Sequence, residues 1–367
     1  MIKNRLLEKE RFTEEPYRIG YIFDEAPVET DWLIVTFSAI PAADSPIKHQ
    51  YSFTRVTNGF PCHRLFLQDT PGEIGCYYLC QNLDFGYINT VSSLVLRICD
   101  EHRIPRSHII TVGSSKGGTS SLIYALCLNA GHCITLVPQT MIGTFVRATF
   151  PDTFRFMIGN RTDSDGGEQV LNQVVFNALD NRRDTVLHLL TSRGDAQFAN
   201  HIQPLLDALE ELAPPSPRND ARNDILIDNR IQSHQDVSRF SENYIINKIN
   251  EILSGKTEWD GIAEPYSTTS VPLDQIVVNH EISVSGFDVT VTLGVSDEIQ
   301  KLIPTPQFAF YLRDADKAVI SRTVYSSEPR ATFRIPNSGT YHIRYFVKQC
   351  DQKIAVSLPG FSVPNPD

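Results

Sequence analysis

The pattern of hydrophobic and polar positions divides the chain into two parts of different character. Up to about residue 253, runs of β-branched and aromatic residues alternate with segments whose apolar residues recur at helical spacing. This alternation predicts an α/β fold with a mainly parallel sheet and flanking helices, because the crossover between parallel strands is usually a helix. We predict strands at 31–40, 51–56, 63–69, 108–112, 133–139, 184–192 and 225–228, and helices at 87–103, 120–131 (closed by Gly131), 166–179, 198–212 and within 237–253.

After residue 270, apolar and polar residues alternate one by one. The run 282–293, "ISVSGFDVTVTL", is typical, and further strands are predicted at 307–312, 318–325, 331–335, 340–347 and 353–358. About seven short strands in roughly 95 residues predict an all-β, Ig-like sandwich. We therefore expect residues 1–255 to form one domain, 256–270 a linker and 271–367 a second domain.

Composition and charge narrow the function classes. The chain has 367 residues, and its net charge of -10 at pH 7 argues against a nucleic-acid-binding protein, which usually carries a basic face. The N-terminal segment is charged throughout, and no stretch approaches the roughly 18 consecutive apolar residues of a transmembrane helix. The seven cysteines form no C-x-x-C pair, so neither a disulfide framework nor a zinc site is indicated. These features predict a cytoplasmic protein without a metal or a tightly bound cofactor.

One short motif carries candidate chemistry. The segment 113–117, "GSSKG", fits the G-x-S-x-G pattern of a nucleophile elbow, between the predicted strand 108–112 and a helix. In such an elbow a sharp turn holds the serine in a strained conformation, and the two glycines leave room for the chain to fold back. The helix that follows directs the positive end of its dipole at the serine. The pattern predicts that Ser115 is a nucleophile.

Two later residues complete a candidate triad in the chain order Ser, Asp, His. Asp195 follows the predicted strand 184–192, and His234 follows the predicted strand 225–228. Because both lie at carboxyl ends of parallel strands, they can meet Ser115 at one edge of the sheet. His234 would act as general base and acid, and Asp195 would orient its imidazole. His201 is a rival base, and the rival carboxylates are Asp224, Asp228 and Asp236.

An acyl-transfer site also needs donors for the oxyanion. The backbone N–H of Lys116 is expected to provide one, and the loop after the strand 31–40, with Phe37 and Ser38, is expected to provide the other. The side chain of Lys116 is interpreted either as solvated or as attracting an anionic substrate.

Other interpretations of the same motif stay open. "GSSKGGTSS" between a strand and a helix is also typical of an anion-binding nest. It fails the Walker pattern, since its lysine precedes the glycine pair, but it resembles the K-G-G-T loop of some sulfotransferases. That hypothesis leaves Asp195 and His234 unexplained. A third hypothesis is a non-catalytic partner in a glycan or export complex, in which the turn is structural.

At these residues the chain resembles a known group. The "GSSKGG" elbow, the "GD" at 194–195 and the "SHQD" at 233–236 are similar to those of α/β-hydrolase-fold proteins of bacterial glycan pathways. The group includes the accessory Sec-system glycan O-acetyltransferases and related capsular-polysaccharide biosynthesis proteins, and the resemblance covers roughly residues 19–253. It implies acyl-ester chemistry on a carbohydrate through Ser115, Asp195 and His234. It leaves open whether the reaction is hydrolysis or transfer from a donor such as acetyl-CoA, and whether the protein associates with a glycan-assembly complex.

Overall fold

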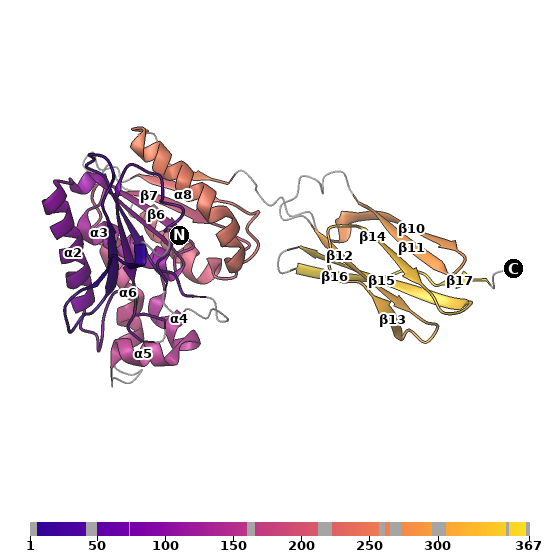
Figure 1. Cartoon of the computed structure of the whole chain (residues 1–367). Coiled ribbons are helices and arrows are strands. Elements are labelled where there is room, and N and C mark those ends of the chain that lie inside the picture. Colours follow the sequence, from indigo (N-terminus) through magenta and orange to yellow (C-terminus); the bar gives the residue numbers. More distant parts are fainter. Residues whose placement is uncertain are drawn as a thin grey trace. The chain divides into compact units, whose positions relative to one another are not determined.

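The chain forms two compact units, Met1–Glu264 and Pro265–Asp367, which we call unit 1 and unit 2 (Figure 1). The structure is a computed structural model, and it describes residues 6–41, 50–72, 74–159, 166–211, 222–256, 261–264, 273–295, 306–349 and 352–364. Among the described helices, none combines the length and the apolar character that crossing a lipid bilayer requires.

Unit 1 is built on a sheet whose described strands follow the order β1-β2-β4-β3-β5-β6-β7-β8-β9. The strands are β1 (Glu10–Phe12), β2 (Gly20–Asp24), β3 (Leu33–Phe37), β4 (His63–Gln68), β5 (Ile109–Ser114), β6 (His132–Leu136), β7 (Val186–Thr191), β8 (Asn223–Ile227) and β9 (Gly261–Ala263). β2 pairs antiparallel with β1 and β4, and every pairing from β4 to β9 is parallel. The carboxyl ends of β3 and β5 to β8 therefore lie at one edge of the sheet.

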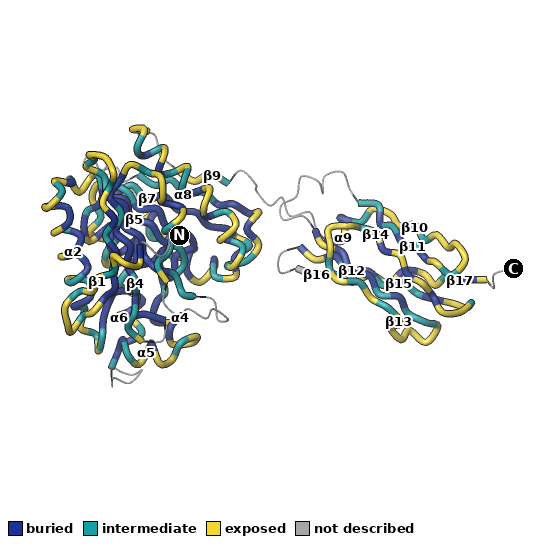
Figure 2. The backbone as a smooth tube through the Cα atoms, in the orientation of Figure 1, coloured by how far each residue is buried: buried dark blue, intermediate teal, exposed yellow. Residues whose placement is uncertain are grey.

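Helices cover both faces of this sheet. They are α2 (Gly86–His102), α3 (Lys116–Leu128), α4 (Ile142–Thr149), α5 (Pro151–Ile158), α6 (Gly167–Asp180), α7 (Gln203–Glu211) and α8 (Val237–Leu253). Successive residues of β3 point to opposite faces, so Val35 packs in the core with α2, α3, α6 and α7, while Ile34 packs in the core with α8. Both cores are buried in Figure 2, which explains why every residue of β3 is buried and all but Thr36 are apolar.

Most predicted elements of unit 1 are present, but the segment 51–56 is not a strand. Phe53 has φ 59°, and its carbonyl accepts the N–H of Thr57, so these residues form a turn. The helix predicted at 120–131 begins at Lys116 and ends at Leu128, where Asn129 takes the left-handed conformation that Gly131 was expected to supply. Position 131 requires glycine for a different reason: the backbone of Ser107 lies so close that a Cβ there would be 1.9 Å from its carbonyl oxygen.

The segment 256–270, expected to be a linker, contains β9. This strand pairs parallel to β8, and the adjoining Glu264 accepts hydrogen bonds from Asn229 Nδ2 (2.7 Å) and Arg193 Nε (3.1 Å). These contacts extend unit 1 beyond residue 255. Most of the segment between the predicted helix 198–212 and the predicted strand 225–228 lies outside the described residues, as do residues 265–270.

Unit 2 consists of antiparallel sheets that share one core. The described strands are β10 (Val277–Ser285), β11 (Asp288–Val295), β12 (Gln307–Arg313), β13 (Val319–Arg322), β14 (Arg330–Arg334), β15 (Gly339–Gln349), β16 (Gln352–Ser357) and β17 (Phe361–Val363), after a short helix α9 (Leu273–Ile276). One sheet has the order β10-β11-β14 and the other β13-β12-β15-β16, with β17 paired to β15. Val291, Phe333, Phe310 and Ile343, from both sheets, belong to the same cluster.

The run 282–293 is a hairpin and not one strand. β10 and β11 turn between Ser285 and Asp288, where the apolar alternation changes phase at Gly286. The antiparallel sheets agree with an all-β domain, and the Ig-like sandwich stays a prediction.

Candidate active site

Ser115 lies at the tight turn between β5 and α3. Its backbone has φ 55° and ψ -121°, a strained conformation for a residue with a side chain. A Cβ at Gly113 would lie 1.9 Å from the carbonyl oxygen of Gly117, and a Cβ at Gly117 would lie 2.5 Å from the carbonyl oxygen of Phe37. The turn therefore requires glycine at both positions, two residues before and two after the serine.

His234 contacts both Ser115 and Asp195. Its Nε2 lies 2.8 Å from Ser115 Oγ, and its Nδ1 lies 2.8 Å from Asp195 Oδ2. If Nδ1 carries the proton and donates it to the carboxylate, Nε2 is left to accept from the serine hydroxyl. The side chain of Asp195 is fully buried and that of His234 is 25% exposed. Asp195 Oδ1 also accepts the N–H of Gln197 at 2.9 Å, which fixes the carboxylate. The structure thus brings together three predicted residues from segments far apart in the chain.

His201, the rival base, makes other hydrogen bonds. His201 Nδ1 accepts the N–H of Met141 at 3.1 Å, and Thr140 Oγ1 donates to the carbonyl of His201 at 2.5 Å. Burial lowers the pKa of His201 to about 4. This ring therefore anchors the segment after β6, and it is a neutral acceptor near pH 7.

The rival carboxylates also have other partners. Asp224 pairs with His188 Nδ1 at 2.8 Å and Lys248 Nζ at 2.9 Å. Asp228 pairs with Arg230 at 2.6 Å, and Asp236 Oδ2 accepts from Ser233 Oγ at 2.8 Å. Asp195 is the carboxylate that contacts His234.

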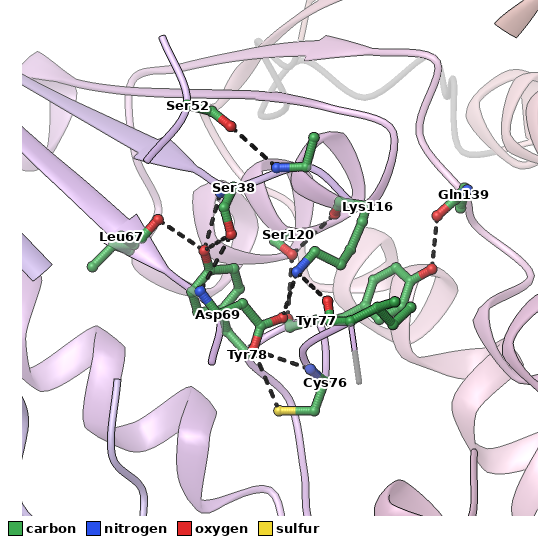
Figure 3. A network of polar contacts seen from close by, with 12 residues as sticks. Ser38, Ser52, Leu67, Asp69, Cys76, Tyr77, Tyr78, Lys116, Ser120 and Gln139 are labelled. Carbon is green, nitrogen blue, oxygen red and sulfur yellow. Dashed lines mark hydrogen bonds and ion pairs between the residues drawn. The ribbon is translucent and has the colours of Figure 1, made fainter. Parts of the chain in front are cut away.

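The side chain of Lys116 is neither solvated nor available to a substrate. Its Nζ is buried, lies 3.0 Å from Asp69 Oδ2, and donates to the carbonyl of Ile74 at 2.8 Å (Figure 3). Asp69 Oδ1 accepts the N–H of Cys76 at 3.0 Å. A Cβ at Gly75 would lie 2.3 Å from the Asp69 carboxylate and 2.7 Å from Lys116 Nζ. The ion pair therefore requires glycine at position 75. The expectation of an exposed lysine is wrong because this partner lies on a distant loop.

The predicted oxyanion donor Ser38 is also engaged in other contacts. The N–H of Ser38 donates to Tyr78 Oη at 3.0 Å, and Ser38 Oγ shares a 2.7 Å hydrogen bond with the same hydroxyl (Figure 3). Phe37 is the last residue of β3, and its buried ring packs against Tyr78 and Tyr124. The next N–H, that of Ala39, donates to Ser52 Oγ at 3.2 Å. The prediction that Ser38 offers a free N–H is therefore wrong in this structure.

Lys116 N–H stands at the start of α3, beside Ser115. First-turn N–H groups have no acceptor within their own helix, so this donor is placed as the elbow pattern predicts.

A chain of hydrogen-bonded side chains that the sequence did not predict leads to the loop of Asp195. Tyr77 Oη donates to Gln139 Oε1 at 2.7 Å, and Gln139 Nε2 donates to Gln197 Oε1 at 3.3 Å. The backbone N–H of Gln139 also donates to Thr119 Oγ1 in α3 at 2.7 Å. The segment after β6 is thereby joined to both the elbow helix and the Asp195 loop. Its sequence signal is a polar pair, Gln139-Thr140, at the end of an apolar run.

Comparisons with known proteins identify the fold. No family model and no curated protein sequence matches this chain. Solved structures do match it, among them a capsule O-acetyltransferase of Neisseria meningitidis serogroup A, in a histidine-to-alanine variant in complex with CoA. That match has 17% sequence identity and a TM-score of 0.55, and covers 68% of this chain and 100% of the other.

A second match is the Glycosylation Associate Protein (Gap123) complex from Streptococcus agalactiae. It has 15% identity and a TM-score of 0.54, and covers 69% of this chain and 47% of the other. At these identities the likeness establishes the fold of unit 1.

Proposed function

We propose that the protein is a serine acyl enzyme, an O-acetyltransferase or esterase that acts on an O-acyl group of a bacterial glycan. The observation that carries this proposal is the position of His234 between Ser115 Oγ and Asp195 Oδ2, at 2.8 Å from each. A nucleophile, a base and a group that orients the base are the arrangement that acyl transfer through serine requires.

In the first half-reaction, Ser115 Oγ attacks the acyl carbonyl while His234 Nε2 takes the hydroxyl proton. Asp195 stabilises the imidazolium through Nδ1, and the N–H of Lys116 donates to the developing oxyanion. When the tetrahedral intermediate collapses, the bond to the leaving group breaks and that group takes the proton from His234. The acyl group is then an ester of Ser115.

In the second half-reaction, a hydroxyl group attacks this ester and gives its proton to His234, which returns it to Ser115. Attack by water gives an esterase, and attack by a sugar hydroxyl gives a transferase. The fold shared with a capsule O-acetyltransferase solved with CoA supports a glycan acceptor and an acetyl-CoA donor. The match to the Gap123 complex supports association with a glycan-assembly complex.

The sulfotransferase hypothesis has less support. It needs Lys116 Nζ to reach a phosphate, and this group is buried against Asp69. No second function is proposed.

A fluorophosphonate probe tests the nucleophile. We expect it to label the wild-type protein and not Ser115→Ala. Ser114→Ala is the matched control, since Ser114 precedes the nucleophile at the end of β5, and it should label normally. Labelling that survives Ser115→Ala would refute the proposed nucleophile, and absence of labelling in the wild type would favour a non-catalytic role.

Release of acetate from an acetyl ester, measured with and without a glycan acceptor, separates the two outcomes. An acceptor that becomes acetylated identifies a transferase, and free acetate alone identifies an esterase. His234→Ala should lower either rate by a factor on the order of 10⁶.

A further inference from the structure

The described strands of one sheet of unit 2 carry several basic residues and no acidic ones. On β12 and β15 the residues Phe310, Leu312, Ile343 and Tyr345 belong to the core, so the alternate residues point outward. The basic residues on the outer side of the sheet β13-β12-β15-β16, here called the basic face, are Arg313, Arg322, Arg344, Lys348 and Lys353. None of these four strands contains an aspartate or a glutamate.

The other sheet of unit 2 is electrically mixed. Its strands carry Glu281 and Asp288 together with Arg330 and Arg334. Because the whole chain has a net charge of -10, the basic face is a local departure from the composition.

Aromatic rings support the cations of the basic face without neutralising them. Lys353 Nζ lies 4.7 Å and Arg344 Cζ lies 5.5 Å from the centroid of the Phe346 ring. The rings of Phe346 and Tyr311 lie next to each other, with centroids 4.7 Å apart. A cation–π contact holds the cation in place but leaves its full positive charge.

The register of the strands places like charges opposite each other. Lys348 on β15 is the direct partner of Lys353 on β16, and such pairing of like charges destabilises a sheet. Within the described residues of unit 2, none of the basic-face cations forms an ion pair, whereas Arg334 on the other sheet pairs with Asp288 at 3.0 Å. A local feature that costs stability is expected at a functional surface.

We propose that the basic face binds an anionic polysaccharide. Along β15, Arg344 and Lys348 point the same way about 13 Å apart, with Phe346 between them. Separated cations of this kind fit acidic groups that repeat along a linear polymer better than they fit a single small ion. The neighbouring rings of Phe346 and Tyr311 offer apolar surface to the C–H groups of a sugar. Binding of a polyanion rests on this face alone, and the choice of a polysaccharide rests on the proposed function of unit 1.

Binding of fluorescently labelled polygalacturonate to the full chain tests the proposal, with neutral dextran as the reference polymer. We expect polygalacturonate to bind with an affinity that falls as salt rises, and dextran to bind far more weakly. The double variant Arg344→Gln/Lys353→Gln should bind about tenfold more weakly or worse. Arg330→Gln/Arg334→Gln, which makes the same change in net charge on the other sheet, should bind within about twofold of the wild type.

Three results would overturn the proposal. They are equal binding of dextran, equal loss in both double variants, and tighter binding of oligo(dT) or anionic lipid vesicles than of polygalacturonate. The last result would assign the face to a different polyanion. Ser115→Ala should bind polygalacturonate like the wild type, so failure of the acyl-enzyme proposal in the labelling experiment is distinguishable from failure of this one.

Discussion

The buried pair of Lys116 and Asp69 allows a quantitative test of the structure. The side chains are 1% and 0% exposed, and Nζ and Oδ2 are 3.0 Å apart. The variant Asp69→Asn keeps an amide oxygen for the N–H of Cys76, but removes the charge and turns an amide donor toward the ammonium group. Breaking a buried ion pair by removing one charge typically costs about 3–5 kcal/mol, because the other charge stays buried without compensation. We expect the free energy of unfolding to fall by about this amount.

Urea denaturation monitored by tryptophan fluorescence measures the effect. The chain has two tryptophans, Trp32 and Trp259, so a Trp259→Phe background restricts the signal to Trp32 in unit 1. Asp152→Asn is the control, since Asp152 pairs with Arg155 on the surface of α5 and both side chains are more than 70% exposed. This control should leave the urea midpoint almost unchanged.

A second variant distinguishes the cost of the unpaired charge from general misfolding. Lys116→Met added to Asp69→Asn removes the unpaired charge at similar volume, and the double variant should be more stable than Asp69→Asn alone. The reasoning is wrong if Asp69→Asn costs less than about 1 kcal/mol, or if the double variant is the less stable of the two.

Three further predictions concern the same unit. Gly117→Ala should abolish probe labelling and lower the melting temperature, because its Cβ would lie 2.5 Å from a backbone oxygen of β3; normal labelling would contradict the elbow geometry. His201→Asn should keep probe labelling while His234→Ala loses it, and the reverse pattern would make His201 the base. Burial lowers the pKa of His132 from 6.5 to about 3. Between these two pH values the imidazole is protonated in the unfolded chain and neutral in the folded chain. Stability should therefore fall as the pH decreases from about 6.5 toward 3, and His132→Asn should flatten this dependence, as measured by urea midpoints at pH 7 and pH 5.

The parts of the site that could be predicted from the sequence depend on local chain geometry. The elbow needs two glycines within five residues, between a strand and a helix. Asp195 and His234 follow the ends of β7 and β8 by four and seven residues. Each of these relations spans a few residues, so the sequence displays them. Parallel strands then bring their carboxyl ends together without further information.

The parts that could not be predicted depend on long-range contacts. Tyr78 Oη accepts a hydrogen bond from the N–H of Ser38, and the two residues are 40 positions apart in the chain. Asp69 and Lys116 are 47 positions apart. Neither residue stands in a motif, and a lysine inside an elbow is ordinarily expected to be exposed. The hairpin at 282–293 is different, since the change of phase at Gly286 is visible in the sequence and marks the turn between β10 and β11.

The lysine inside the elbow also bears on how the strained serine is held. A conformation such as that of Ser115 costs about 1–3 kcal/mol and persists when surrounding contacts fix it. The N–H of Ser115 donates to the carbonyl of Leu136 at 2.9 Å, which fixes the turn to β6. On the other side, the side chain of the next residue, Lys116, is fixed by Asp69 and by the carbonyl of Ile74. The residue whose N–H is proposed to meet the oxyanion is therefore immobilised by its own side chain.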